Sequence, residues 1–200
     1  MDRVEAHSDA TAKSTMKANA PRTAPSHANV EKVNAELFTF TYGAVVRQLI
    51  EDYEDLDEVN KQLDEMGYNI GVRIIDDFLA KSEADKCITF EGTVQTIAGS
   101  AFRMFLGVTA TVEKWNEDKT ECSLLLEDNP MVDHVEIPEK NAKLVYCNML
   151  CGVLRGALLQ VSLRVQASIE RDVLKGDDVT EIRLRLLEQI PEEYPFKDDE

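Results

Sequence analysis

The residues of this chain best suited to chemistry are four cysteines, Cys87, Cys122, Cys147 and Cys151, and one histidine, His134. A cysteine nucleophile needs a base within reach, and His134 is the histidine that lies outside the polar N-terminal segment. No local signature joins it to Cys87, although the sequence leaves that pair open. The cysteines also have no CxxC or Cys/His zinc spacing, which argues against a redox motif or a metal centre.

Ordinary packing explains most of these residues. Cys147 and Cys151 lie four residues apart in an apolar segment, and free cysteine behaves as a small hydrophobe, so we interpret both as core residues. His134 lies in the run VDHV (132–135), which is typical of a half-buried strand histidine. Phosphate loops and dinucleotide fingerprints are also missing from the sequence. We therefore predict that the chain alone is not an enzyme.

Composition narrows the function classes further. The 200 residues are 44% hydrophobic and 30% charged, which suits one globular domain. The formal charge of −16 opposes binding to nucleic acid, which needs a basic surface. The longest apolar run, 144–154, is stopped by Arg155, short of the roughly 18 to 20 residues of a spanning helix. Without an apolar signal-peptide core or paired cysteines, we expect a cytosolic protein with reduced thiols.

The organisation of the chain follows from its hydrophobic periodicity. Residues 1–33 have few large apolar side chains and no period, so we expect a disordered tail before a domain over 34–200. Apolar residues at helical spacing predict helices over 35–50, 59–78, 94–106 and 142–160. The buried stripes that we predict for the first two are Leu37, Phe38, Thr41, Val45 and Leu49, then Val59, Leu63, Met66, Ile70, Ile74 and Phe78.

Glycines at one-turn spacing lie inside two of these helices. Gly67 and Gly71 are in the second, and Gly152 and Gly156 are in the fourth. Each costs about 1 kcal/mol relative to alanine in a helix, and the usual compensation is close approach of another backbone. We therefore expect these helices to pack unusually closely.

Alternating or β-prone runs predict strands over 109–115, 121–126, 132–137, 161–169 and 182–186, with turns at 116–119 and 175–178. Helices first, then hairpins divided by one long helix, predict an α+β fold in which an antiparallel sheet is covered on one side by helices.

Several longer motifs identify a family. The runs ELFTFTYGA (36–44), MGYNIGVR (66–73), NPMVD (129–133), CGVLRGA (151–157) and KGD (175–177) occur in that order. Together they closely resemble subunit three of the trafficking protein particle complex, TRAPP, the acylated small-subunit family. The resemblance covers about residues 33 to 194, and His134 departs from it because the family usually has a large aromatic residue there.

The resemblance implies the function. It indicates a TRAPP small-subunit fold with a buried apolar channel, and a core scaffold subunit that pairs with other TRAPP small subunits or with itself. The complex tethers vesicles in ER-to-Golgi transport and promotes guanine nucleotide exchange on an early-secretory Rab GTPase. The implied location is cytoplasmic and peripheral, at cis-Golgi and endoplasmic reticulum membranes, through the assembly.

The resemblance also assigns sites. The family carries a fatty acyl chain, palmitate, in thioester linkage to a cysteine that matches Cys87. Ala101 matches a small residue that keeps the acyl channel open, and Ala98, Phe102 and Phe105 on the same helix are expected to line it. The family's C-terminal segment contacts the GTPase, which corresponds here to Lys197, Asp198, Asp199 and Glu200.

Two other functions stay open at this point. An apolar cavity beside Cys87 would also suit a hydrophobic small-molecule or lipid-binding module, without a covalent bond. A cysteine-dependent acyl-transfer enzyme would need turnover that depends on both Cys87 and His134.

Overall fold

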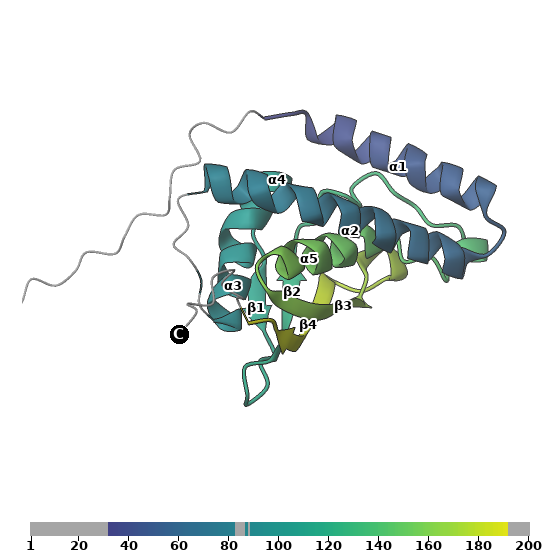
Figure 1. The fold of residues 1–200 in the computed structure, drawn as a ribbon. Helices are drawn as coiled ribbons and strands as arrows, with labels where there is room; N and C mark the ends of the chain where they lie inside the picture. Colours follow the sequence, from purple (N-terminus) through teal and green to yellow (C-terminus); the bar gives the residue numbers. More distant parts are fainter. Residues whose placement is uncertain (1–31, 83–86, 88, 192–200) are drawn as a thin grey trace, which may run out of the picture.

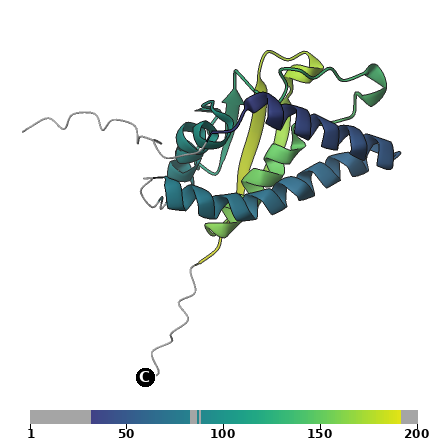
Figure 2. The ribbon, with the colours of Figure 1, turned by 90° about the horizontal axis from the view of Figure 1, so that it is seen from above.

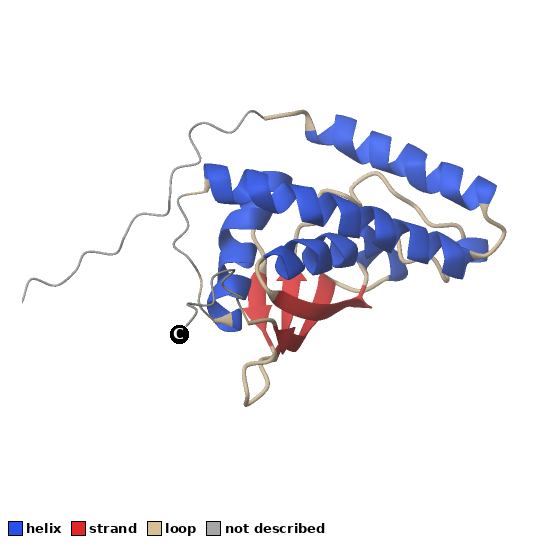
Figure 3. Ribbon diagram, in the orientation of Figure 1, coloured by secondary structure: helices blue, strands red, loops and turns tan. Residues whose placement is uncertain are grey.

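The computed structural model describes residues 32–82, 87 and 89–191, and in this part of the chain a layer of helices lies on one antiparallel sheet (Figure 3). This arrangement confirms the predicted α+β class. The helices are α1 (Ala35–Asp52), α2 (Leu56–Lys81), α3 (Phe90–Thr96), α4 (Phe102–Leu106) and α5 (Asn148–Gln160), and the strands are β1 (Thr111–Glu113), β2 (Glu121–Leu126), β3 (Leu163–Arg171) and β4 (Thr180–Gln189). The predicted tail, 1–33, falls almost entirely outside the described residues.

Both predicted hairpins form, and they join through their inner strands. The sheet order is β1-β2-β4-β3, and every neighbouring pair is antiparallel. Leu124 pairs with Ile182, and Cys122 pairs with Leu184; all four side chains are buried and belong to the core that the sheet shares with the helices. The helices cover one face of the sheet (Figure 1). Side chains alternate between the two faces of a strand, so this register places the core on the helix side.

The closest contact between helices is the α2–α5 crossing, as the glycine spacing predicted. A Cβ atom on Gly67 would lie 2.0 Å from the Met149 carbonyl oxygen, and one on Gly152 would lie 2.0 Å from the Asp64 carbonyl oxygen. Neither position has room for any side chain larger than hydrogen. Gly71 and Gly156 are similarly close to the opposite backbone, so both pairs lie in one helix crossing (Figure 1).

The predicted strand over 132–137 is wrong, because this segment forms turns. The amide of Val132 donates to the Asn129 carbonyl, and the amide of Val135 donates to the Val132 carbonyl, at 3.1 Å each. The Asn129 side chain also accepts a hydrogen bond from the Met131 amide. Local hydrogen bonds therefore occupy backbone groups that a strand would need for its ladder.

The fourth predicted helix begins later than expected, at Asn148 rather than near Ala142. Its predicted first turns are held against α2 by Asn60, whose side-chain oxygen accepts from the Val145 amide at 2.7 Å and whose side-chain nitrogen donates to the Lys143 carbonyl at 3.1 Å. A side chain from a distant helix thus replaces the hydrogen bonds that would have extended α5.

The third predicted helix forms, but it contains a π-helical turn over Ile97–Ala101. The Phe102 amide donates to the Ile97 carbonyl, five residues back. In an α-helix this amide would bond the Ala98 carbonyl, which instead accepts from the Ala110 amide at 3.0 Å. The wider turn therefore links the helix directly to the start of the sheet.

Helix α1 is attached less closely than the others. It meets α2 at the turn that joins them, and the two helices diverge from there (Figure 2). Its buried residues are Thr39, Tyr42 and Val46. The predicted stripe is wrong for Leu37, Phe38 and Thr41, which are exposed. On α2, the predicted stripe also includes Ile70, whose side chain is exposed, whereas the glycine positions are buried.

Candidate functional site

Cys87 lies just before α3, beside the end of that helix. Thr89 caps α3 by accepting a hydrogen bond from the Gly92 amide at 3.1 Å. Two residues earlier, the partly exposed Cys87 places its Sγ 3.2 Å from Oγ1 of Thr96, the last residue of α3. The thiol of Cys87 thus contacts the hydroxyl group of the last residue of α3.

The three other cysteines lie in the core and differ chemically from Cys87. Cys147 and Cys151 are 0% exposed, which confirms that they are core residues, and Cys122 is 1% exposed. Burial raises the pKa of each of these thiols to about 12, since a thiolate is poorly solvated there. Neighbouring acidic groups add to the effect: Glu121 for Cys122, Asp172 for Cys147 and Asp64 for Cys151.

The expected channel residues occupy several environments along α3 and α4. Ala98 and Phe102 are buried in the main core, while Ala101 is half-buried. Phe105 is 36% exposed, and its ring lies 6.4 Å from that of Phe78. Positions 96 and 98 are two residues apart and therefore point to nearly opposite sides of the helix, so the Cys87 sulfur contacts a different side from Ala98. A channel from Cys87 past Ala101 stays a prediction.

His134 is not the half-buried strand residue that its neighbours predicted. It is exposed, in a turn, and its ring stacks on Phe40 of α1 with centroids 5.5 Å apart and planes 22° apart. The thiol of Cys87 contacts α3 instead. The two members of the hypothetical nucleophile–base pair therefore contact different helices.

An exposed apolar surface, which we call the α1 patch, consists of Leu37, Phe38, Phe40 and His134. The first three are 65%, 40% and 60% exposed. The sequence interpretation missed this surface because it assigned Leu37 and Phe38 to the core and omitted Phe40. The available signal was that apolar residues of α1 lie on more than one face, which is typical of a helix with a second contact surface.

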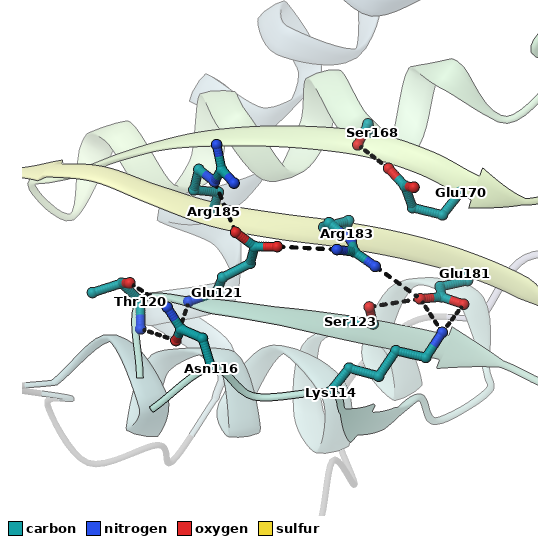
Figure 4. Close-up of polar contacts among 10 residues, drawn as sticks. All are labelled: Lys114, Asn116, Thr120, Glu121, Ser123, Ser168, Glu170, Glu181, Arg183 and Arg185. Atoms are coloured by element: carbon teal, nitrogen blue, oxygen red, sulfur yellow. Dashed lines mark hydrogen bonds and ion pairs between the residues drawn. The ribbon is translucent and has the colours of Figure 1, made fainter. Parts of the chain in front are cut away.

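The outer face of the sheet carries a charge network around Glu181, which is 1% exposed (Figure 4). Its carboxylate accepts hydrogen bonds from Lys114 at 2.6 and 2.7 Å, from Ser123 at 2.7 Å and from Arg171 at 2.8 Å. Burial alone would raise the pKa of Glu181, but these three donors outweigh burial and hold the pKa at about 2. The carboxylate is therefore charged at neutral pH, with its partners within one chain.

A helix layer thus lies on a four-stranded sheet, an apolar surface is exposed on α1, and one of the four cysteines is partly exposed. Among the described residues, none of the helices has both the length and the apolar content to cross a membrane. The family model for transport protein particle (TRAPP) components matches residues 38–185. The chain therefore belongs to the TRAPP component family.

Individual relatives agree with this assignment. The chain is 48% identical to trafficking protein particle complex subunit 3 of Dictyostelium discoideum, over 83% of this chain and 90% of the relative. It is 43% identical to trafficking protein particle complex subunit BET3 of Saccharomyces cerevisiae, over 84% and 89% of the two chains. Among solved structures, subunit 3 of the complex from Naegleria fowleri, covalently bound to palmitic acid, is 46% identical with a TM-score of 0.78, covering 81% of this chain and all of that one.

Proposed function

We propose that this chain is a non-catalytic core scaffold subunit of the TRAPP vesicle-tethering complex in ER-to-Golgi transport. In this role it contributes to the complex's guanine nucleotide exchange on an early-secretory Rab GTPase, at the cytoplasmic surface of cis-Golgi and endoplasmic reticulum membranes. The observation that carries the proposal is the 48% identity to a subunit 3 of this complex over 83% of the chain. The relatives reported above are likewise named as subunits of a trafficking complex.

The α1 patch is the proposed contact with another TRAPP small subunit, or with a second copy of this chain when no partner is present. Leu37 and Phe40 are well over half exposed, and large exposed apolar side chains on one helix favour association, because burial removes them from water. His134, stacked on Phe40, takes the place of the family's aromatic residue and extends the same surface. Partner choice would then depend on both side chains.

Co-expression with each TRAPP small subunit, followed by size-exclusion chromatography, tests this contact. We expect Leu37→Ser with Phe40→Ser to abolish co-elution with the partner. Leu187→Ser is the matched control, because Leu187 is also 56% exposed but lies on β4. A chain that stays monomeric with every subunit, or a double variant that still co-elutes, would contradict the proposed surface.

We also propose that Cys87 carries a palmitoyl group in thioester linkage. The Naegleria relative is covalently bound to palmitic acid, and Cys87 is the partly exposed cysteine of this chain, whereas the other three are buried. A chain of about 14 methylenes gains on the order of 11 kcal/mol on leaving water. If the acyl chain enters the protein past Ala98, Ala101, Phe102 and Phe105, it acts as additional hydrophobic core rather than as a membrane anchor.

Intact mass spectrometry of protein made in a eukaryotic cell tests the acylation. We expect the mass increment of one palmitoyl group, which is released by hydroxylamine and is missing from Cys87→Ser. An unmodified mass with extractable lipid would instead indicate the alternative, a lipid-binding module without a covalent bond. An unmodified mass without lipid would contradict both.

The contribution to nucleotide exchange is assigned to the C-terminal segment, including Lys197, Asp198, Asp199 and Glu200, which lies outside the described residues. Its carboxylates would occupy the anion-binding surface that nucleotide phosphates leave on the GTPase. We expect deletion of residues 191–200 to slow exchange by the assembled complex without changing its subunit composition. Unchanged exchange with intact assembly would reject this role.

A further inference from the structure

The contact between Cys87 and Thr96 joins the end of α3 to a residue that precedes the helix. Their Sγ and Oγ1 atoms are 3.2 Å apart, and either atom is able to donate. A threonine inside a helix commonly donates its hydroxyl back to the carbonyl four residues earlier. Here the hydroxyl is within reach of the sulfur instead, nine residues away in sequence.

We infer that Thr96 is a positioning residue for Cys87, whose hydroxyl donates to the sulfur and favours the thiolate. The inference rests on the proposed acylation of Cys87 and adds to it what controls the reactivity of that site. A thiol and a hydroxyl form a weak mutual hydrogen bond, in which either is the donor. A thiolate has lost its hydrogen, so the hydroxyl must donate, and a hydrogen bond to a charged acceptor is about twice as strong. The contact therefore stabilises the thiolate more than the thiol.

The thiolate is the form that attacks an acyl donor. In the reaction, the Cys87 sulfur attacks the carbonyl carbon of a fatty acyl thioester, a bond forms between Sγ and that carbon, and the bond from that carbon to the donor's sulfur breaks. The donor thiol leaves as a thiolate and takes up from solvent the proton that Cys87 released. One thioester replaces another, so neither an oxidant nor a reductant is required. The product sulfur is uncharged, so the hydroxyl favours the attacking state over the product.

The remaining cysteines make this effect measurable in the whole chain. Cys122, Cys147 and Cys151 are each at most 1% exposed, and burial raises the pKa of each to about 12, so a thiol reagent reports on Cys87 in the folded protein. Cys87→Ser supplies the blank. Thr96→Val removes the hydroxyl with nearly unchanged shape, and Thr96→Ser retains the hydroxyl.

The experiment measures alkylation by iodoacetamide, and acyl transfer from palmitoyl-CoA, as rates against pH on full-length protein. At neutral pH we expect Thr96→Val to react about threefold more slowly than wild type. Loss of the hydroxyl removes a hydrogen bond to the charged sulfur, and the higher intrinsic nucleophilicity of a thiolate without that bond offsets part of the loss in rate. At high pH, where both thiolates are fully formed, the order reverses, so the two alkylation profiles cross. Thr96→Ser follows wild type.

Superimposed profiles for Thr96→Val and wild type would overturn the inference. A Thr96→Ser profile that follows Thr96→Val would also overturn it, because the shape of the side chain and not its hydroxyl would then determine the rate. Thr96→Ala gives the same reading if the valine variant does not fold. The alkylation profile is independent of the proposed function. If wild-type protein from a eukaryotic cell carries no acyl mass, the proposed acylation fails, while the crossing of the profiles still decides the role of Thr96.

Discussion

The α2–α5 crossing and helix α1 are both parts of one helix layer, yet they are built in opposite ways. At the crossing, the backbones are so close that a Cβ atom on Gly67 or Gly152 would lie 2.0 Å from a carbonyl oxygen. Helix α1 buries Thr39, Tyr42 and Val46 and leaves Leu37 and Phe40 largely exposed. The crossing is thus complete within one chain, whereas α1 has apolar side chains that the described part of the chain leaves exposed.

The difference shows how a small subunit separates folding from assembly. A contact between backbones tolerates almost no change of volume, so it holds the fold in one arrangement. An exposed apolar helix face contributes little to the monomer and gains free energy when a partner covers it. We expect substitutions in the two regions to have separate effects, the first on unfolding and the second on association.

The largest effect should come from the crossing. Gly152→Ala would place a Cβ atom 2.0 Å from the Asp64 carbonyl oxygen, so the helices must separate, and we expect a loss of more than about 4 kcal/mol in the free energy of unfolding. Gly99→Ala is the control, since a Cβ there meets nothing within 4 Å, and the change should be neutral or stabilising by less than about 1 kcal/mol. Chemical denaturation measures the free energy of unfolding of both variants. Equal losses would contradict the claim that the α2–α5 crossing is sensitive to added volume.

The sheet's outer face offers a polar network that is likewise completed within the chain. Glu181→Gln should lower the free energy of unfolding by about 3 kcal/mol at pH 7, because Lys114 and Arg171 lose their counter-charge. The folded pKa of Glu181, about 2, lies below its unfolded value of about 4.3. The stabilisation that ionised Glu181 provides is therefore fully present at pH values above its unfolded pKa. It is lost as the pH falls through its folded pKa. Denaturation between pH 6 and 2 should show a shallower loss for the variant, and parallel curves would contradict this.

The attachment of α1 to the core should have an intermediate effect. The Tyr42 hydroxyl donates to the Tyr146 carbonyl, and burial raises the pKa of Tyr42 far above its usual range. Tyr42→Phe leaves the buried Tyr146 carbonyl without this donor. We therefore expect the free energy of unfolding, measured by thermal denaturation, to fall by about 1 to 2 kcal/mol. Tyr53→Phe, at the more exposed end of the same helix, should leave the melting temperature unchanged. Equal shifts would mean that α1 is not anchored at Tyr42.

The α1 patch should have the smallest effect on folding. Phe40→Ser changes a side chain that is 60% exposed, so the free energy of unfolding of the isolated chain should change by less than about 0.5 kcal/mol. Val46→Ala, on the buried side of α1, should cost about 1 to 3 kcal/mol. If Phe40→Ser destabilises the monomer as much as Val46→Ala, the patch is part of the fold and the comparison above is wrong.

Much of this protein follows from its sequence alone. Helical periodicity located α1 and α2, and alternating or β-prone runs located β2, β3 and β4, because these signals report structure within one turn or along one strand. The glycine pairs predicted close packing of helices, because glycine leaves room for another backbone. The motifs also identified the TRAPP component family, whose model matches residues 38–185. Cys147 and Cys151 were correctly placed in the core.

Contacts that periodicity does not report decided the rest. Asn60 of α2 determines where α5 begins, the local hydrogen bonds around Asn129 replace a predicted strand, and the Ala110 amide bonds a carbonyl in the π turn. Periodicity could not say which face of α1 turns inward, because apolar residues lie on more than one face. In the structure Leu37 is exposed, whereas Tyr42 is buried and its hydroxyl donates to the Tyr146 carbonyl. The same holds at Cys87. The sequence identified the thiol, and only the tertiary structure shows the Thr96 hydroxyl beside its sulfur, because the two residues are nine positions apart and no sequence pattern joins them.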